Sequence, residues 1–294
     1  MRYLLFISLL FANSSAFSGE TIDRTLDADP NGEIHIDIIR GDVDIKTWNK
    51  SQVHVEGSLD DASEEFIFKR SGNKTLIKVE IDHGFFSKNW NSDETDITIH
   101  IPADSSLHST GVSTDFDITG VKGGINANSV SGDIDVDEAL QEIDIETVSG
   151  DVSITDSEGK MQLATVSGDI QAFSNAIHFD ATTVSGDVEA EIGLSDLIDL
   201  SSVSGDLDMD FELADGGRVD ARTVSGDITL SFDNKVVNAR FDINTGPGGD
   251  IKNSITKDKA ESSFIGSENV RFKSGNGDGA VELETMSGTI EIRH

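Results

Sequence analysis

Six aspartates stand at equivalent places in the sequence, each at the end of a Val-Ser-Gly-Asp tetrapeptide: Asp133, Asp151, Asp169, Asp187, Asp206 and Asp227. Stacked carboxylates supply the oxygen ligands that calcium prefers. The sequence contains neither an EF-hand loop nor the glycine-rich nonapeptide of calcium-binding β-rolls. We therefore expect each carboxylate to accept hydrogen bonds inside its own turn, and weak calcium binding between neighbouring aspartates is the alternative.

The basic residues are too scattered along the sequence to suggest an active site. Glycoside hydrolases pair two carboxylates, and polysaccharide lyases also need a base. From residue 111 to residue 240 the bases are Lys122, Lys160, His178, Arg218, Arg222, Lys235 and Arg240. His35, His54 and His100 lie in alternating segments, without an HExxH motif or a close histidine pair. The sequence predicts a protein that is not an enzyme and has no cofactor, with a polysaccharide hydrolase or lyase as a distant alternative.

The tetrapeptides mark an internal repeat. Their valines are separated by 18, 18, 18, 19 and 21 residues: Val130, Val148, Val166, Val184, Val203 and Val224. In all six copies the residues five and three positions before the valine, and four and six positions after it, are apolar. Alternation at period two predicts half-buried strands, and Ser-Gly-Asp is typical of a turn. Each repeat is therefore predicted as a strand, a corner, a second strand and a polar return.

The alternation also predicts which corner side chains face solvent. We count the valine as buried, which places the aspartate outward in a column with neighbours about 5 Å apart. Adjacent carboxylates would then repel by roughly 0.8 kcal/mol in water. A hydroxyl residue precedes every valine, and we expect this polar column on the surface: Ser129, Thr147, Thr165, Thr183, Ser202 and Thr223.

A unit of this length cannot bury its apolar side alone, so successive units must stack. The sequence predicts an all-β protein, a single-stranded β-solenoid with 18–21-residue coils and irregular strand-rich caps. Within the N-terminal part we expect strands at residues 52–56, 65–69, 75–81 and 96–101. The predicted organisation is a signal peptide at 1–16, an N-terminal cap and first coils at 17–110, regular repeats at 111–232, and irregular C-terminal coils and cap at 233–294.

Composition indicates an exported, acidic protein. Residues 1–16 combine Arg2, an apolar run and a small-residue cleavage site, as in a secretory signal peptide. The chain has no cysteine and a formal net charge of −33. Such a charge disfavours nucleic acid and anionic lipid headgroups as partners. We expect no transmembrane segment in the mature chain and place it in the periplasm, at the cell surface or outside the cell.

Four motifs carry a resemblance to a known family: the repeated V-S-G-D-I/V/L corners, Gly41–Ile45, Ile101–Ala103 and Thr285–Ile290. Together they resemble the bacterial putative-adhesin family of exported β-strand-repeat proteins, a domain of unknown function, over roughly residues 30–294. The resemblance implies a right-handed β-helix, in agreement with the usual handedness of parallel crossovers. It also implies an adhesin-like or envelope-associated binding or scaffold protein whose partner is an unknown protein or glycan. The alternative is a periplasmic regulatory or sensing partner of the cell envelope.

Overall fold

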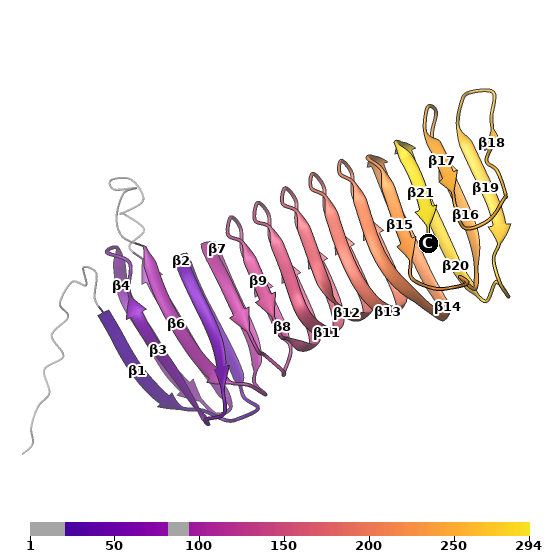
Figure 1. The fold of residues 1–294 in the computed structure, drawn as a ribbon. Helices are drawn as coiled ribbons and strands as arrows, with labels where there is room; N and C mark the ends of the chain where they lie inside the picture. The colour runs from indigo at the N-terminus through magenta and orange to yellow at the C-terminus, as the bar shows by residue number, and fades with distance from the viewer. Residues whose placement is uncertain (1–20, 82–93) are drawn as a thin grey trace, which may run out of the picture.

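The computed structural model describes residues 21–81 and 94–294, and every regular element in these ranges is a β-strand (Figure 1). The all-β, strand-rich expectation is therefore confirmed, whereas the predicted signal peptide lies outside the described residues. The strands are β1 (Thr21–Asp27), β2 (Glu33–Trp48), β3 (Gln52–Ser58), β4 (Ser63–Ser71), β5 (Lys74–Ile81), β6 (Thr95–Pro102), β7 (Ser106–Thr119), β8 (Ile125–Asn128), β9 (Ile134–Asp137), β10 (Leu140–Glu146), β11 (Val152–Ala164), β12 (Ile170–Thr182), β13 (Val188–Ser201), β14 (Leu207–Ser225), β15 (Ile228–Phe232), β16 (Ala239–Thr245), β17 (Asp250–Asn253), β18 (Glu261–Ser262), β19 (Glu268–Lys273), β20 (Gly279–Ser287) and β21 (Thr289–Arg293).

Successive repeats in the middle of the chain pair in parallel, one coil upon the next. Ile154 pairs with Ala172 and Leu163 with Ala181, so equivalent residues of neighbouring coils are partners. The columns predicted to be apolar are buried between the two layers of strands; Ile143 and Ile145, for example, have no exposed surface. Each coil thus buries its apolar side chains against those of the coils above and below.

The stack has two faces and two edges. The acidic face carries the outward side chains of β9, β15 and the first halves of β11 to β14, which follow the corners. The mixed face carries those of β8, β10, β16, β19, β20 and the second halves of β11 to β14. The V-S-G-D corners form one edge, the corner edge, seen as a row of narrow loops in Figure 1. Along the opposite, return edge, the long strands bend, and all the register shifts among β11 to β14 lie there.

At the C-terminal end the order of coils in space differs from their order in the sequence. The last coil, β20 and β21, pairs in parallel with β14 and β15 on one side. On its other side it pairs in parallel with β16 and β17, which precede it in the chain (Figure 1). The antiparallel strand β19 then covers β16. The C-terminal segment is therefore held between two earlier coils.

The N-terminal end has the same kind of arrangement. Strand β2 pairs in parallel with β7 on one side and with β5 and β6 on the other. Antiparallel strands then cover this end, because β4 pairs with β5 and β3 joins β6 to β1. The four strands predicted within this part are confirmed as β3, β4, β5 and β6.

Candidate functional site

The glycine of each corner is needed because neighbouring coils touch backbone to backbone. A Cβ atom added to Gly150 would lie 1.9 Å from the carbonyl oxygen of Gly132, and one added to Gly168 would lie 1.9 Å from that of Gly150. Neither glycine is among the residues with positive φ. Close approach, not backbone conformation, therefore selects glycine at these positions.

The hydroxyl column lies inside the stack, so the prediction that it faces solvent is wrong. Thr165 is buried. Its Oγ1 accepts a hydrogen bond from the Gly168 N–H at 3.1 Å and donates one to the Gly150 carbonyl of the preceding coil at 3.2 Å. The same pair of bonds is made by Thr147. The hydroxyl points inward because the corner's backbone groups need partners there.

The valines face outward, so the prediction that they are buried is also wrong. Because the hydroxyl residue takes the inward position, the next side chain along the chain must point out. Between 40% and 52% of each side chain is exposed in a ridge that runs along the corner edge: Val112, Val130, Val148, Val166, Val184, Val203, Val224 and Met286. Eight coils therefore present an apolar residue to solvent at the same place.

The corner aspartates are exposed, as predicted, but their hydrogen bonds run between coils and not within each turn. The Asp151 N–H donates to Oδ1 of Asp133 at 2.8 Å, and the Asp169 N–H donates to Oδ1 of Asp151 at 2.8 Å. Equivalent bonds link the remaining members of the column: Asp115 to Asp133, Asp169 to Asp187, Asp187 to Asp206, and Asp206 to Asp227. These charge-assisted bonds offset the repulsion along the column.

No cluster of three or more histidine, aspartate or glutamate side chains suited to a metal ion occurs in the described parts of the chain. Each of the six candidate aspartates Asp133, Asp151, Asp169, Asp187, Asp206 and Asp227 uses one carboxylate oxygen as a backbone acceptor. Weak calcium binding between coils stays a hypothesis, and the ion would have to bind the second carboxylate oxygen of each aspartate, which does not take part in these bonds.

The acidic face continues the charge of the corner column. Two further outward columns follow each corner, and between β7 and β15 their side chains are carboxylates, hydroxyls, one glutamine and one phenylalanine. Burial raises the pKa of Asp135, and the neighbouring charges of Asp133, Asp115 and Asp151 raise it further against a hydrogen bond from Ser153. The pKa of Asp117 is raised in the same way, by burial and then by Asp135. Ionisation of these carboxylates is therefore disfavoured in the folded state.

The mixed face gathers cations that are far apart in the sequence. One row of paired outward residues, the outer row, runs in spatial order Glu142, Lys160, His178, Leu197, Arg218, Ala280, Arg240 and Lys273. The interpretation that the bases are scattered is thus wrong for five of them, because coil stacking brings Lys160, His178, Arg218, Arg222 and Arg240 onto one face. The repeat itself aligns Lys160, His178 and Arg218, because each stands six residues before the valine of the following corner. Arg240, in contrast, joins the row only through the spatial order of the C-terminal coils.

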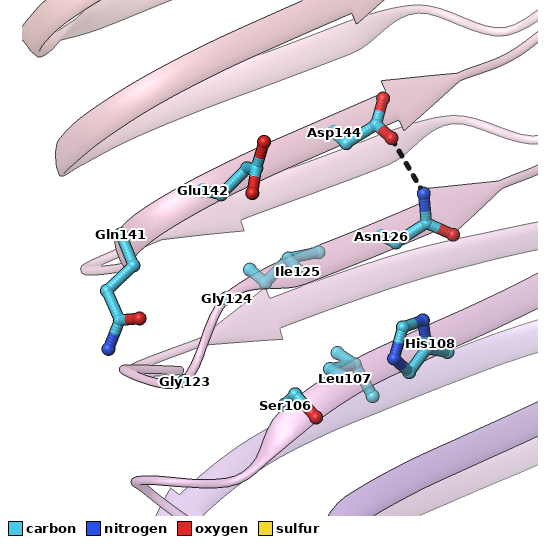
Figure 2. A pocket seen from close by; sticks show the side chains of 10 residues that line it. All are labelled: Ser106, Leu107, His108, Gly123, Gly124, Ile125, Asn126, Gln141, Glu142 and Asp144. Atoms are coloured by element: carbon cyan, nitrogen blue, oxygen red, sulfur yellow. Dashed lines mark hydrogen bonds between the residues drawn. The ribbon is translucent and has the colours of Figure 1, made fainter.

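Two hollows lie on the regular part of this face. A cleft of about 330 Å³ is lined by Gly124 and Glu142, and Gly124 contributes no side chain to it (Figure 2). His108, Asn126 and Asp144 line it, and the Asn126 amide donates to the Asp144 carboxylate at 2.9 Å. A smaller hollow of about 220 Å³ lies around Lys160 and His178.

The histidines also come together, contrary to the expectation that no close pair exists. The rings of His35 and His108 stack with centroids 4.6 Å apart. Burial lowers the pKa of His35, and Lys74 and His108 lower it further. At the N-terminal end of the stack, the ring centroids of His54 and His100 are 6.2 Å apart, and those of Trp48 and His100 are 5.2 Å apart. Parallel and antiparallel pairing of distant strands creates both pairs, so local motifs could not reveal them.

The fold and these surfaces define an all-β repeat protein with exposed columns of identical residues. Its sequence matches the model of the Toastrack DUF4097 family over residues 31–293, and the chain belongs to this family. No curated protein matches the chain. Within the described ranges no helix is long and apolar enough to cross a membrane.

Solved structures with low sequence identity cover most of the chain. A putative adhesin from Bacteroides fragilis is 14% identical, with a TM-score of 0.44, and the match covers 94% of this chain and 98% of that one. A putative cell adhesion protein from Clostridium sporogenes is 10% identical, with a TM-score of 0.29, and the match covers 93% and 99%.

Proposed function

We propose that this protein is an exported, non-enzymatic β-solenoid, right-handed and single-stranded, that binds a protein or glycan of the cell envelope through its corner edge. The exposed ridge from Val112 to Met286 carries the proposal. The fold explains the buried hydroxyl, the glycine and the aspartate of each corner, but nothing in the described contacts requires an apolar residue at the outward position. Long exposed apolar patches on soluble proteins mark interaction sites.

The column of aspartates beside the ridge restricts the charge of any partner that binds there. Asp151, Asp169 and their equivalents stand three residues after the valines and are exposed along the same edge. A partner surface that covers the ridge must therefore accept a row of carboxylates, which favours cationic or hydroxyl-rich groups around an apolar strip. The same charge disfavours a second copy of this acidic chain on the ridge. The adhesion names of the similar structures support a binding role of this kind.

The edge is tested by replacing three adjacent valines with threonine, as Val148→Thr, Val166→Thr and Val184→Thr in one chain. Threonine keeps the branched shape while it replaces one of the two exposed methyl groups of valine with a hydroxyl. We expect the variant to melt like the parent and to bind isolated envelope fractions of the producing cells at least about tenfold more weakly, the equivalent of about 1.4 kcal/mol. A matched Lys160→Gln variant on the mixed face should bind like the parent. Equal binding by the threonine variant would remove the ridge from the proposal.

Location separates the two binding roles. Intact producing cells are treated with a protease and then fractionated, and the mature chain is followed by immunoblot. Loss of the chain on protease treatment supports an adhesin-like role at the surface. Protection, with release on osmotic shock, supports a periplasmic regulatory or sensing role instead. Recovery in the cytoplasm would overturn both.

A further inference from the structure

A third opening on the mixed face differs from the others in its charge. It is a cleft of about 560 Å³ over β16, β19 and β20, in the interleaved C-terminal coils. Arg240, Arg271 and Lys273 line it, together with the carboxylates of Asp242 and Glu282. In a chain with 55 acidic and 22 basic residues, three cations around one opening are unusual.

Two of these cations have no counterion within the described ranges. Arg271 is paired with Asp242, Nε to Oδ2 at 2.9 Å. Arg240 and Lys273, in contrast, make no side-chain hydrogen bond or ion pair there. They are direct partners across the antiparallel pair of β16 and β19. Like charges placed opposite each other on neighbouring strands destabilise the pair, so a bound anion between them would offset a cost that the fold leaves uncompensated.

The repeat is broken at this place in a way that makes room for a ligand. The outer row carries a long side chain at most positions, but Ala280 stands between Arg218 and Arg240. Phe241, Phe272 and Val281 also line the opening. The stem of Lys273 lies over Gly277, where an added Cβ would meet its Cε at 2.7 Å. The aliphatic chain of Lys273 is therefore packed against Gly277, although the residue as a whole is exposed.

The carboxylates in the same cleft indicate what else the ligand presents. Asp242 is held ionised: burial acts to raise its pKa, but hydrogen bonds from Arg271 and Asn244 outweigh burial and lower it. Glu282 lies near Arg218, with Nη2 to Oε2 at 3.4 Å. Ionised carboxylates accept hydrogen bonds from hydroxyl groups. A bare oxyanion or a polyanion would meet these negative charges, whereas a sugar offers them its hydroxyls.

We propose that this C-terminal cleft binds an acidic saccharide, with the carboxylate of the sugar between Arg240 and Lys273 and its hydroxyl groups on Asp242 and Glu282. The volume suits one to a few sugar units. This site is separate from the corner edge, and it does not depend on which partner the ridge binds.

The experiment is an amide NMR titration of the purified mature chain with three probes. These are a glucuronate-containing disaccharide, the corresponding neutral glucose disaccharide, and inorganic phosphate. We expect the acidic disaccharide to shift amides of β16, β19 and β20, with much weaker effects from the other two. Arg240→Gln and Lys273→Gln should each weaken its binding about tenfold or more. Lys160→Gln, which removes a cation from β11 on the same face, should leave the affinity unchanged.

Each other result overturns the proposal in a definite way. Phosphate that binds as tightly as the disaccharide would make this a general anion site without saccharide recognition. Equal binding of the neutral sugar would remove the role of Arg240 and Lys273. Absence of shifts at β16, β19 and β20 with all three probes would show that the cleft takes no ligand of this class. Because the titration uses no cells and no envelope fraction, these failures are distinguishable from a failure of the proposed function at the corner edge.

Discussion

The middle of the stack and its two ends are built from the same coils but assembled by different rules. From β7 to β15 each coil pairs with the next one in the sequence. At both ends a coil is instead inserted between two coils that follow one another in the chain: β2 lies between the coil of β5 and β6 and that of β7, and β20 with β21 lies between the coils of β14 with β15 and of β16 with β17. Coils that follow the sequence order thus lengthen the stack, whereas the insertion of one coil between two others, here called interleaving, occurs at its two ends.

The difference has a physical reason. A stack of parallel coils ends in a row of unpaired backbone groups, which is a template for further strand pairing. Here the final coils are flanked by antiparallel strands, β19 over β16 and β3 over β6. The inserted coils, β2 and β20 with β21, cannot detach without breaking hydrogen bonds on both sides. The ends are therefore expected to open less easily than those of a stack that follows the sequence order.

The largest effect should come from removing the last coil. A chain that stops before residue 279 loses the partner that β14, β15, β16 and β17 all share. We expect residues 233–278 to become protease-sensitive, because their coil then has no parallel neighbour. Deletion of residues 148–165, a whole coil from the middle, joins Thr147 to Val166 in register and should leave a chain that unfolds cooperatively. Limited proteolysis with mass spectrometry compares the two, and equal protection of 233–278 in the truncated chain would contradict interleaving.

In the middle, the tightest constraint is the glycine of the corner. Gly150→Ala places a methyl group against the Gly132 carbonyl and must push two coils apart. We expect a loss of about 3 kcal/mol in the free energy of unfolding, as for overpacking at a rigid site. Urea denaturation measures this loss. Ser149→Ala, at the exposed neighbouring residue, should change stability by less than about 0.5 kcal/mol. A similar loss in both variants would show that the corners do not hold the coils in contact.

A smaller effect should follow from substitutions at the next corner, where the side chain of Thr165 points inward and that of Val166 points outward. Thr165→Val leaves the Gly168 N–H and the Gly150 carbonyl without their partner and should cost about 1–3 kcal/mol. Val166→Thr changes an exposed side chain and should be nearly neutral. The two substitutions exchange the same two residue types, so their difference in urea midpoint reports orientation alone. If Val166→Thr is the more costly of the two, the valines and not the hydroxyls face the interior.

The sequence was sufficient for the regular middle and misleading at its corners. Strict period-two alternation identified the buried columns, such as Ile143 and Ile145, because those positions lie in extended strands. At the corner the chain leaves the extended conformation, and the hydroxyl of Thr165 turns inward to serve backbone groups that alternation does not count. On the mixed face, the repeat alone places Lys160, His178 and Arg218 in one row. The places of Arg240 and Lys273, and the two histidine pairs, depend on which strands are neighbours in space, and the sequence order does not give this.

The stability of the middle should depend on pH through its half-buried carboxylates, of which Asp135 on the acidic face is one. The folded-state pKa of Asp135 is raised above its ordinary value of 3.8 by burial and by neighbouring aspartates. Its ionised form therefore destabilises the fold at neutral pH, and the parent should gain stability as the pH falls through this raised pKa. Asp135→Asn should raise the melting temperature at neutral pH, and the difference from the parent should vanish as the pH approaches the ordinary value. A difference that is independent of pH would mean that the charge of Asp135 is not the cause.

The smallest expected effect is that of calcium on the acidic edge. The ladder bonds from each aspartate Oδ1 to the next coil already offset much of the repulsion between neighbouring carboxylates. Calcium therefore has little left to neutralise, and at a concentration equal to its dissociation constant it would add only about 0.4 kcal/mol. We expect a melting temperature about 1 °C higher in millimolar calcium than in chelator at equal ionic strength, a shift of the size that this free energy gives in a chain of this length. An unchanged melting temperature would exclude calcium from the aspartate column and leave the backbone ladder as the sole compensation of its charge.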